Sequence, residues 1–315
     1  TMELLEDVSW SSEKGEKYGT LANVGCDTHG EVYVVAGNLL YQIVSGKLEQ
    51  IRNLTEASEN PGPENTQLEI FSLAFDTSDL FYISSNWYGL QVFRNAKKNE
   101  EDENDLLFSL PEWQGPFNLS HPSGQLCGVN YKDNEAGVLS FISWNKDKNE
   151  LNVRPFPCWG ADHGNWFMKG RDPLFSIRRA WYADRIMLYI VDPVSYQIPE
   201  DGLRSLHMFF APNGKDIARL SHTFLSCPWH EGLKMAFTAE IPHKGVSSEL
   251  LLLTPRGVIT ERGEKLIEFD EFEDEISYTR AFSATDFEGA GAKRKKYVLG
   301  MTTNTNKNFV KILGI

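Results

Sequence analysis

The sequence predicts an all-β fold, a single domain of repeated antiparallel sheets over residues 1–315. Two observations lead to this prediction: a repeat with a constant offset, and a succession of short strand-like runs separated by turn residues. A third is the scarcity of helical signals, since no long segment carries the i, i+3, i+4 apolar pattern of an amphipathic helix. Together they predict short strands that pair locally along the chain.

The repeat is clearest between residues 26–44, "CDTHGEVYVVAGNLLYQIV", and residues 75–93, "FDTSDLFYISSNWYGLQVF". The matched pairs keep an offset of 49 residues without a gap: Asp27 and Asp76, Thr28 and Thr77, Tyr33 and Tyr82, Gln42 and Gln91. Runs such as "EVYVVAG" and "LFYISSN" are rich in β-branched and aromatic residues, which favours buried strands. A period of about 40–50 residues indicates one supersecondary unit used repeatedly.

The same pattern continues more weakly towards the C-terminus. Strand-like runs joined by polar turns lie within 125–156, 174–222, 233–263 and the last segment of the chain. Together with the two clear copies of the repeat, these four segments predict six units. Seven is the alternative, because "LEDVSW" near the N-terminus could belong to a unit shared by both ends, where "LLEDVSW" would pair beside "NFVKILGI".

These features resemble the β-propeller superfamily, with a repeat length similar to that of WD40 blades. The resemblance implies sheets arranged radially around an axis, so that only short, protected sheet edges remain. The chain has no Trp-Asp dipeptide that ends a blade and no Gly-His that opens one. It also has no Ser-x-Asp-x-Gly-x-Thr-Trp box of the sialidase type. The resemblance is therefore to an architecture, and no family's functional residues can be transferred.

Charge and composition exclude several partners. The net charge of −13 argues against nucleic acid, since phosphates require clustered Lys and Arg, and the one basic cluster, 293–296, precedes a strand-like run. No run reaches the ~18 apolar residues of a membrane span. The start lacks the apolar core of a signal peptide, which makes the cytoplasm the expected location. The spacing of the four cysteines fits a reducing compartment: Cys26, Cys127, Cys158 and Cys227.

Motifs for catalysis are absent from the sequence. It contains no GxSxG, GxxxxGK[ST] or HExxH pattern, so we expect no catalytic residues, no cofactor and no metal. The carboxylates of 268–275 form a charge run typical of a solvated surface. A propeller can assemble metal ligands from separate blades, as calcium-dependent lactonases do, and a metal-dependent hydrolase or lactonase is therefore the third functional alternative.

Two segments with Cys, Trp and His beside an acid are candidate binding loops: "PCWGADHGNW" at 157–166 and "SCPWHEG" at 226–232. Trp beside His and carboxylates can stack on a sugar ring or hold a peptide side chain. The structural alternative is that these Trp residues pack between blades. A Trp-Tyr pair in a predicted turn is a further candidate, with a packed turn as its alternative. The candidate ligand-binding residues are Trp159, Asp162, His163, Trp166, Trp229, His230, Glu231, Trp87 and Tyr88.

The function predicted from these observations is a non-catalytic recognition or scaffold module. Its partner would be a protein or peptide, with a basic one favoured by the acidic chain. A lectin-like propeller that binds a sugar is the alternative. Six-bladed fungal fucose-binding lectins use Arg, Glu and Trp or Tyr on every blade, and this chain does not show that repeated set.

Overall fold

The computed structural model describes residues 2–56, 67–76, 78–97, 105–113, 115, 117–120, 125–130, 138–155, 174–180, 185–191, 203–211, 218–226, 236–241, 249–254, 256–260, 264–269, 276–283, 287–289, 292–294 and 296–314. These residues are mostly β-strand, and the single helical element among them is the 3-10 turn η1 at Leu54–Glu56. Within the described chain, no helix has the length and apolarity needed to cross a membrane.

Six four-stranded antiparallel sheets account for most of the described residues. The first sheet contains β2 (Leu21–Cys26), β3 (Val32–Ala36), β4 (Leu39–Val44) and β5 (Lys47–Asn53). The second contains β6 (Ile70–Phe75), β7 (Phe81–Ser85), β8 (Gly89–Phe93) and β9 (Leu106–Leu110). The third contains β10 (Phe117–Ser120), β11 (Gln125–Asn130), β12 (Val138–Asn145) and β13 (Glu150–Pro155).

The remaining sheets follow the same plan. The fourth contains β14 (Leu174–Ala180), β15 (Arg185–Val191), β16 (Leu203–Ala211) and β17 (Ala218–Ser226). The fifth contains β18 (Ala236–Ile241), β19 (Glu249–Thr254), β20 (Gly257–Thr260) and β21 (Lys265–Glu268). The sixth contains β22 (Ile276–Ser283), β25 (Lys296–Thr303), β26 (Lys307–Gly314) and β1 (Glu3–Ser11), and a small hairpin joins β23 (Phe287–Gly289) to β24 (Ala292–Arg294).

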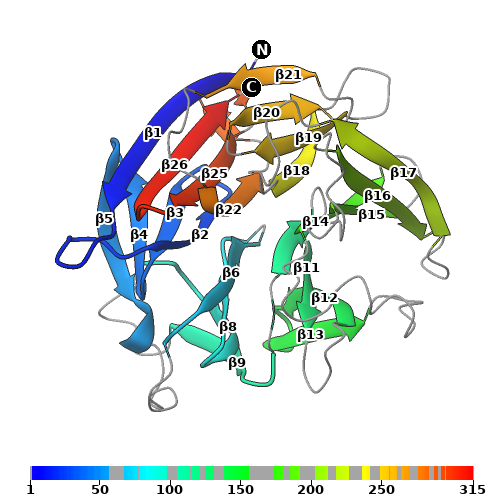
Figure 1. Cartoon of the computed structure of the whole chain (residues 1–315). Coiled ribbons are helices and arrows are strands. Elements are labelled where there is room, and N and C mark those ends of the chain that lie inside the picture. The colour runs from blue at the N-terminus through cyan, green and yellow to red at the C-terminus, as the bar shows by residue number, and fades with distance from the viewer. Residues whose placement is uncertain are drawn as a thin grey trace.

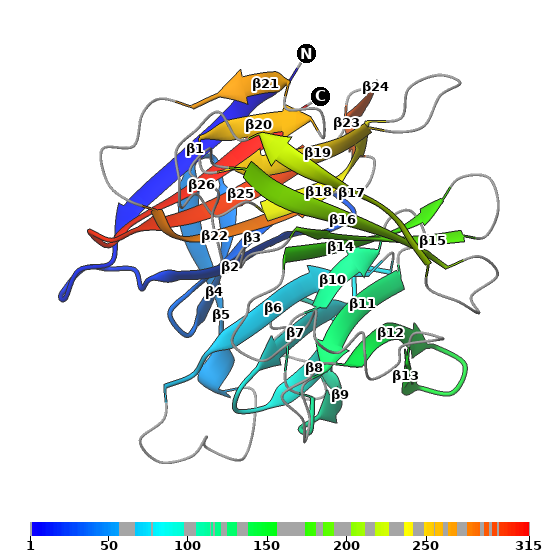
Figure 2. The ribbon, with the colours of Figure 1, turned by 45° about the vertical axis from the view of Figure 1, so that its right-hand side comes forward.

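The sheets are arranged around a common centre, with the first strand of each one innermost (Figures 1 and 2). Each innermost strand contacts the next in the order β2, β6, β10, β14, β18 and β22, and β22 contacts β2. The approach is close: a Cβ added to Gly25 in β2 would lie 2.1 Å from Leu73 Cδ1 in β6. The predicted all-β propeller class is confirmed by this arrangement.

The two ends of the chain meet in the sixth sheet. β1 pairs antiparallel with β26, with Trp10 opposite Asn308, and the two strands lie side by side as blue and red arrows (Figure 1). Asn308 is fully buried, and its amide joins three segments. Its Oδ1 accepts a hydrogen bond from the Leu21 N–H of β2 at 2.9 Å, and its Nδ2 donates to Ser12 Oγ at 3.0 Å. A buried amide with its hydrogen bonds satisfied fixes both the partners and their register.

The repeat seen in the sequence is present in the structure through its first two strands. Asp27 and Asp76 follow the innermost strands β2 and β6, and Tyr33 and Tyr82 lie on the second strands β3 and β7. Both of these innermost strands also have a register shift at the same position, between Leu21 and Asn23 in β2 and between Ile70 and Ser72 in β6. The two sheets therefore share one backbone plan, as the offset of 49 predicts.

The ungapped match does not hold in the third strand, which corrects the pairing of Gln42 with Gln91. Two residues separate β3 from β4, whereas three, Asn86 to Tyr88, separate β7 from β8. As a result Tyr33 lies opposite Gln42, but Tyr82 lies opposite Val92. One extra residue in a hairpin moves every later side chain to the other face of the sheet.

Candidate functional site

The strand order places the strand ends from which the candidate binding connections start on one face of the ring. Four antiparallel strands return the chain to the face from which a sheet began, and we call this the entry face. The connection from β13 to β14 spans 156–173, and that from β17 to β18 spans 227–235, so both start from strand ends at the entry face. The turn between β7 and β8 joins a second strand to a third and lies on the same face.

Two of the nine candidate residues fall in the described part of the chain, namely Trp87 and Tyr88. The others lie outside it: Trp159, Asp162, His163, Trp166, Trp229, His230 and Glu231. Their place in the chain, between an outermost strand and the next innermost strand, is fixed by the strands on either side.

Trp87 and Tyr88 play different parts in the β7–β8 turn. Tyr88 is 7% exposed, its N–H donates to Ser85 Oγ at 3.1 Å, and its hydroxyl donates to the Thr55 carbonyl of η1 at 3.3 Å. The Trp87 ring is half-buried and packs edge-on against Tyr88, with ring centroids 6.0 Å apart. Tyr88 thus serves the packed turn, and Trp87 is the residue of the pair that keeps exposed ring surface.

Asn86 fixes this turn to the segment that precedes β6. Its Oδ1 accepts from the Glu69 N–H at 2.8 Å, and its Nδ2 donates to the Gln67 carbonyl at 2.9 Å. The Asn86 N–H also donates to the Glu69 carbonyl at 3.1 Å. A turn held by three such bonds presents Trp87 in a preset position, which reduces the entropy lost when a ligand binds.

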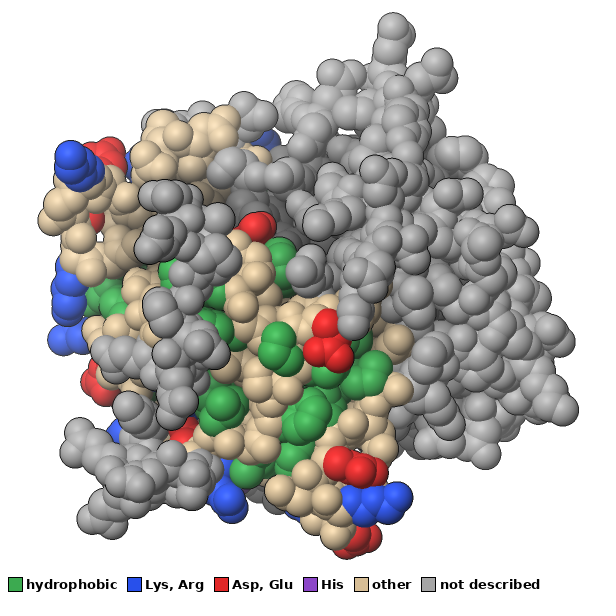
Figure 3. Space-filling view, turned by 90° about the horizontal axis from the view of Figure 1, so that it is seen from below, with side chains coloured by type: hydrophobic (Ala, Val, Ile, Leu, Met, Phe, Trp, Pro, Cys, Tyr) green, Lys and Arg blue, Asp and Glu red, His purple; other side chains and the backbone are tan. Residues whose placement is uncertain are grey.

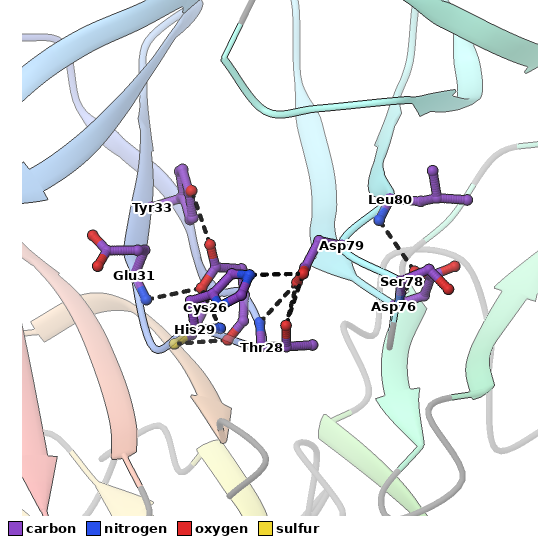
Figure 4. Close-up of polar contacts among 10 residues, drawn as sticks. Cys26, Thr28, His29, Glu31, Tyr33, Asp76, Ser78, Asp79 and Leu80 are labelled. Atoms are coloured by element: carbon purple, nitrogen blue, oxygen red, sulfur yellow. Dashed lines mark hydrogen bonds and ion pairs between the residues drawn. The ribbon is translucent and has the colours of Figure 1, made fainter. Parts of the chain in front are cut away.

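The opposite face, which we call the exit face, carries two equivalent carboxylate turns after β2 and β6 (Figure 4). In the first, Asp27 Oδ1 accepts from the N–H groups of His29 and Glu31, at 3.0 and 2.9 Å. Asp27 Oδ2 accepts from the Tyr33 hydroxyl at 3.0 Å. Burial raises the pKa of Asp27, against the opposing effect of these hydrogen bonds.

The second turn repeats this arrangement atom for atom. Asp76 Oδ1 accepts from the N–H groups of Ser78 and Leu80, at 2.7 and 3.1 Å, and Asp76 Oδ2 accepts from the Tyr82 hydroxyl at 3.0 Å. Burial, followed by the nearby carboxylate charge, raises the pKa of the Tyr82 hydroxyl, and the same holds for Tyr33. Both tyrosines therefore stay protonated donors.

Asp79 joins the two turns across the boundary between the first and second sheets (Figure 4). Its backbone has φ 58°, and the residue 49 positions earlier, Gly30, has φ 80°. The Asp79 carboxylate accepts from the Thr28 N–H at 3.0 Å and from Thr28 Oγ1 at 2.6 Å, and His29 Nε2 lies 3.2 Å from it. This link was not predicted from the sequence. The signal that the sequence offers is Asp79 at the repeat position where the first copy has Gly30, because both residues adopt a positive φ.

The Thr28, His29 and Asp79 side chains do not form a nucleophilic triad. In a triad the histidine takes the proton of the hydroxyl, whereas here the Thr28 hydroxyl donates to the carboxylate, with Oδ1 and Oδ2 both within 2.8 Å. His29 contacts the same carboxylate and is 76% exposed. The arrangement therefore acts as a tether between sheets.

Metal ligands are the other chemistry to consider. Across the described segments, no group of three or more His, Cys, Asp or Glu side chains is placed to hold a metal ion. Cys26 is free and buried beside the first carboxylate turn, and desolvation raises its pKa, so its thiol is kept from the reactive thiolate form.

Comparisons with known proteins give no family. No family profile matches the chain, and no curated protein matches it. Among solved structures, a streptogramin B lyase is 10% identical with a TM-score of 0.48, covering 98% of this chain and 99% of the lyase. AofleA from Arthrobotrys oligospora is 11% identical with a TM-score of 0.46, covering 99% of this chain and 86% of AofleA.

A Trypanosoma rangeli sialidase in complex with the inhibitor DANA is 8% identical with a TM-score of 0.44. The match covers 99% of this chain and 58% of the sialidase. At these values the similarities assign neither an activity nor a ligand to this chain, so the functional argument depends on its own residues.

Proposed function

We propose that this chain is a non-catalytic recognition module that binds a protein or peptide partner through loops on the entry face. The observation that supports the proposal is the half-buried Trp87, held in a hydrogen-bonded turn on the face from which the 156–173 and 227–235 connections start. Rigid aromatic side chains give large contact area at low entropy cost, and such residues dominate binding energies.

The candidate residues of the two connections complete this proposed site. Trp159, Trp166 and Trp229 would supply apolar contact, with Tyr88 holding the turn from below. Directional hydrogen bonds would come from the histidines and their neighbouring acids, namely Asp162, His163, His230 and Glu231. This division between apolar area and a few polar groups is common in binding sites. The net charge of −13 favours a basic partner.

The test selects peptides from a random displayed library on the purified protein and measures the affinity of each selected peptide. We expect basic peptides whose affinity falls at least tenfold with Trp87→Ala and with the Trp229→Ala and His163→Ala pair. The matched control is His29→Ala, which removes an exposed ring from the exit face and should leave affinity unchanged.

Two other outcomes would replace the proposal. Glycan-array binding that Trp87→Ala or Trp229→Ala abolishes would identify a lectin-like propeller. Stoichiometric calcium in the purified protein, together with lactone hydrolysis that chelation abolishes, would identify a metal-dependent hydrolase. Peptides that bind equally well to wild type and to the Trp variants would show that the entry face is not the binding surface.

A further inference from the structure

The outermost strand of the second sheet differs from the other outermost strands in charge. β9 reads Leu-Leu-Phe-Ser-Leu and contains no charged residue, whereas β1, β5, β13, β17 and β21 each contain at least one Asp, Glu, Lys or Arg. Charged residues on an edge strand prevent other strands from pairing with it. β9 therefore lacks the protection that the other five described outer edges have.

The backbone at the start of β9 faces outward. The Arg94 N–H donates to the Asp105 carbonyl at 2.9 Å, beside the pair formed by Phe93 and Leu106. In an antiparallel ladder, a hydrogen bond between the residues next to a pair shows that the pair itself is not hydrogen-bonded. The N–H and C=O groups of the two paired residues, here Phe93 and Leu106, then point away from each other. The backbone groups of Leu106 thus point away from β8, and its side chain is 38% exposed.

The edge is also held in a fixed position. Asp105, the residue before β9, is buried and forms an ion pair with the Arg52 guanidinium. Arg52 also donates to the carbonyls of Asn95 and Ala96, each at 2.9 Å, and lies 4.5 Å from the centre of the Phe93 ring. A strand that is already ordered loses little entropy when another strand pairs with it.

The third sheet provides an apolar surface at the position where an added strand would lie. Phe108 of β9, the fourth strand of the second sheet, packs against Trp144 of β12, the third strand of the third sheet, with ring centroids 6.2 Å apart. A strand added outside β9 would therefore lie over the fourth strand, β13. There Leu151 packs into the cluster shared with Phe108, and Val153, two residues further on the same face, is 36% exposed.

Charge indicates the chemistry of the occupant. Hydrophobic side chains gather on the described part of this side of the molecule, with Asp or Glu and Lys or Arg side chains around them (Figure 3). Glu112, two residues after β9, is exposed, and the chain carries a net charge of −13. Basic residues on a partner would be attracted here, whereas a second copy of this chain would bring the same negative charge.

We propose that the β9 edge docks an extended segment of a partner protein as a fifth strand of the second sheet. The segment carries apolar residues at alternate positions, which face Val153 and Leu151, and Lys or Arg at the positions between. Backbone hydrogen bonds to Leu106 set its register, and the apolar side chains select it. This surface is separate from the entry-face loops and does not depend on the function proposed for them.

The experiment uses fluorescence anisotropy with a labelled, end-blocked peptide of alternating valine and lysine, about six residues long. We expect saturable binding to the full chain. Leu106→Pro, which removes the outward N–H, and Leu106→Lys, which adds a charge repelling the probe, should each weaken binding at least tenfold. The matched control is Gln50→Lys, which adds the same charge to an exposed position of the outer strand β5 and should leave binding unchanged.

Methylated probes distinguish strand addition from simple charge attraction. N-methylation of one alternate set of probe amides should abolish binding, and methylation of the other set should preserve it. Circular dichroism and thermal melting show whether each variant is folded. If Leu106→Pro does not fold, the binding measured with Leu106→Lys tests the proposal. No saturation up to about 1 mM peptide, equal effects of both methylation sets, or a Leu106-dependent dimer of this chain in sedimentation would overturn the proposal.

Discussion

Tyr82→Phe tests the carboxylate turns with the smallest possible change. It removes one hydroxyl, which donates to Asp76 Oδ2 at 3.0 Å, and leaves a ring that is fully buried. Phenylalanine has no donor in this place, so Asp76 Oδ2 loses its hydrogen bond from residue 82. A hydrogen bond to a charged group contributes about 1.5–3 kcal/mol, and we expect the free energy of unfolding to fall by that amount.

The assay is urea unfolding followed by tryptophan fluorescence, with the change taken from the midpoint at an unchanged slope. Tyr33→Phe removes the equivalent bond from the first turn and should cost a similar amount. Tyr41→Phe is the control, because this tyrosine is also buried and its hydroxyl hydrogen-bonds no other described residue. The reasoning fails if Tyr82→Phe costs less than about 0.5 kcal/mol, or no more than Tyr41→Phe.

Three further changes test other parts of the structure. Arg52→Leu leaves Asp105 buried without its partner and should lower the free energy of unfolding in urea by about 3–5 kcal/mol. Adding Asp105→Leu should restore most of this stability, and a double variant as unstable as the single one would contradict the expectation. Because burial raises the pKa of Asp27, the folded state binds the extra proton just above pH 3.8, and stability falls as pH rises through that window. The melting temperature of Asp27→Asn minus that of wild type should therefore increase from pH 4 to pH 7. A difference that stays constant with pH would contradict this expectation. Finally, the association rate of a basic entry-face peptide should fall steeply as salt rises past about 0.15 M, and a rate independent of salt would remove electrostatic steering.

The fold class could be predicted from the sequence because the residues that carry the repeat also hold the turns of the first two sheets together. Asp27 and Asp76 each accept two turn N–H groups and a tyrosine hydroxyl, so the Asp and the Tyr six residues later must be kept together. A turn with such demands leaves a recognisable pattern even where the surrounding residues have diverged. The strands around it need only be apolar and β-branched, which many residues satisfy.

Three other features of the structure could not be predicted from the spacing of residues in the sequence. The third-strand shift depends on one extra residue in the Asn86–Tyr88 turn, and the chance match of Gln42 with Gln91 concealed it. The Asp79 link to Thr28 crosses between sheets, and contacts between distant segments follow no local period. Exposure was equally hidden: Trp87 and Tyr88 are adjacent aromatic residues, yet the hydroxyl bond to Thr55 buries one and leaves the other half-exposed.

The division of labour between the two faces follows from strand number. On the exit face the first turns of two neighbouring sheets are fixed by the Asp27 and Asp76 carboxylates and by the Asp79 tether, so substitutions there alter the packing between sheets. On the entry face each connection joins an outermost strand to the next innermost one, and surface connections generally tolerate sequence changes better than the strands they join. Because an even number of strands returns the chain to that face every time, variable connections far apart in sequence start from one surface. Under the proposed function, binding residues could therefore change on the entry face while the turns that hold the ring stay the same.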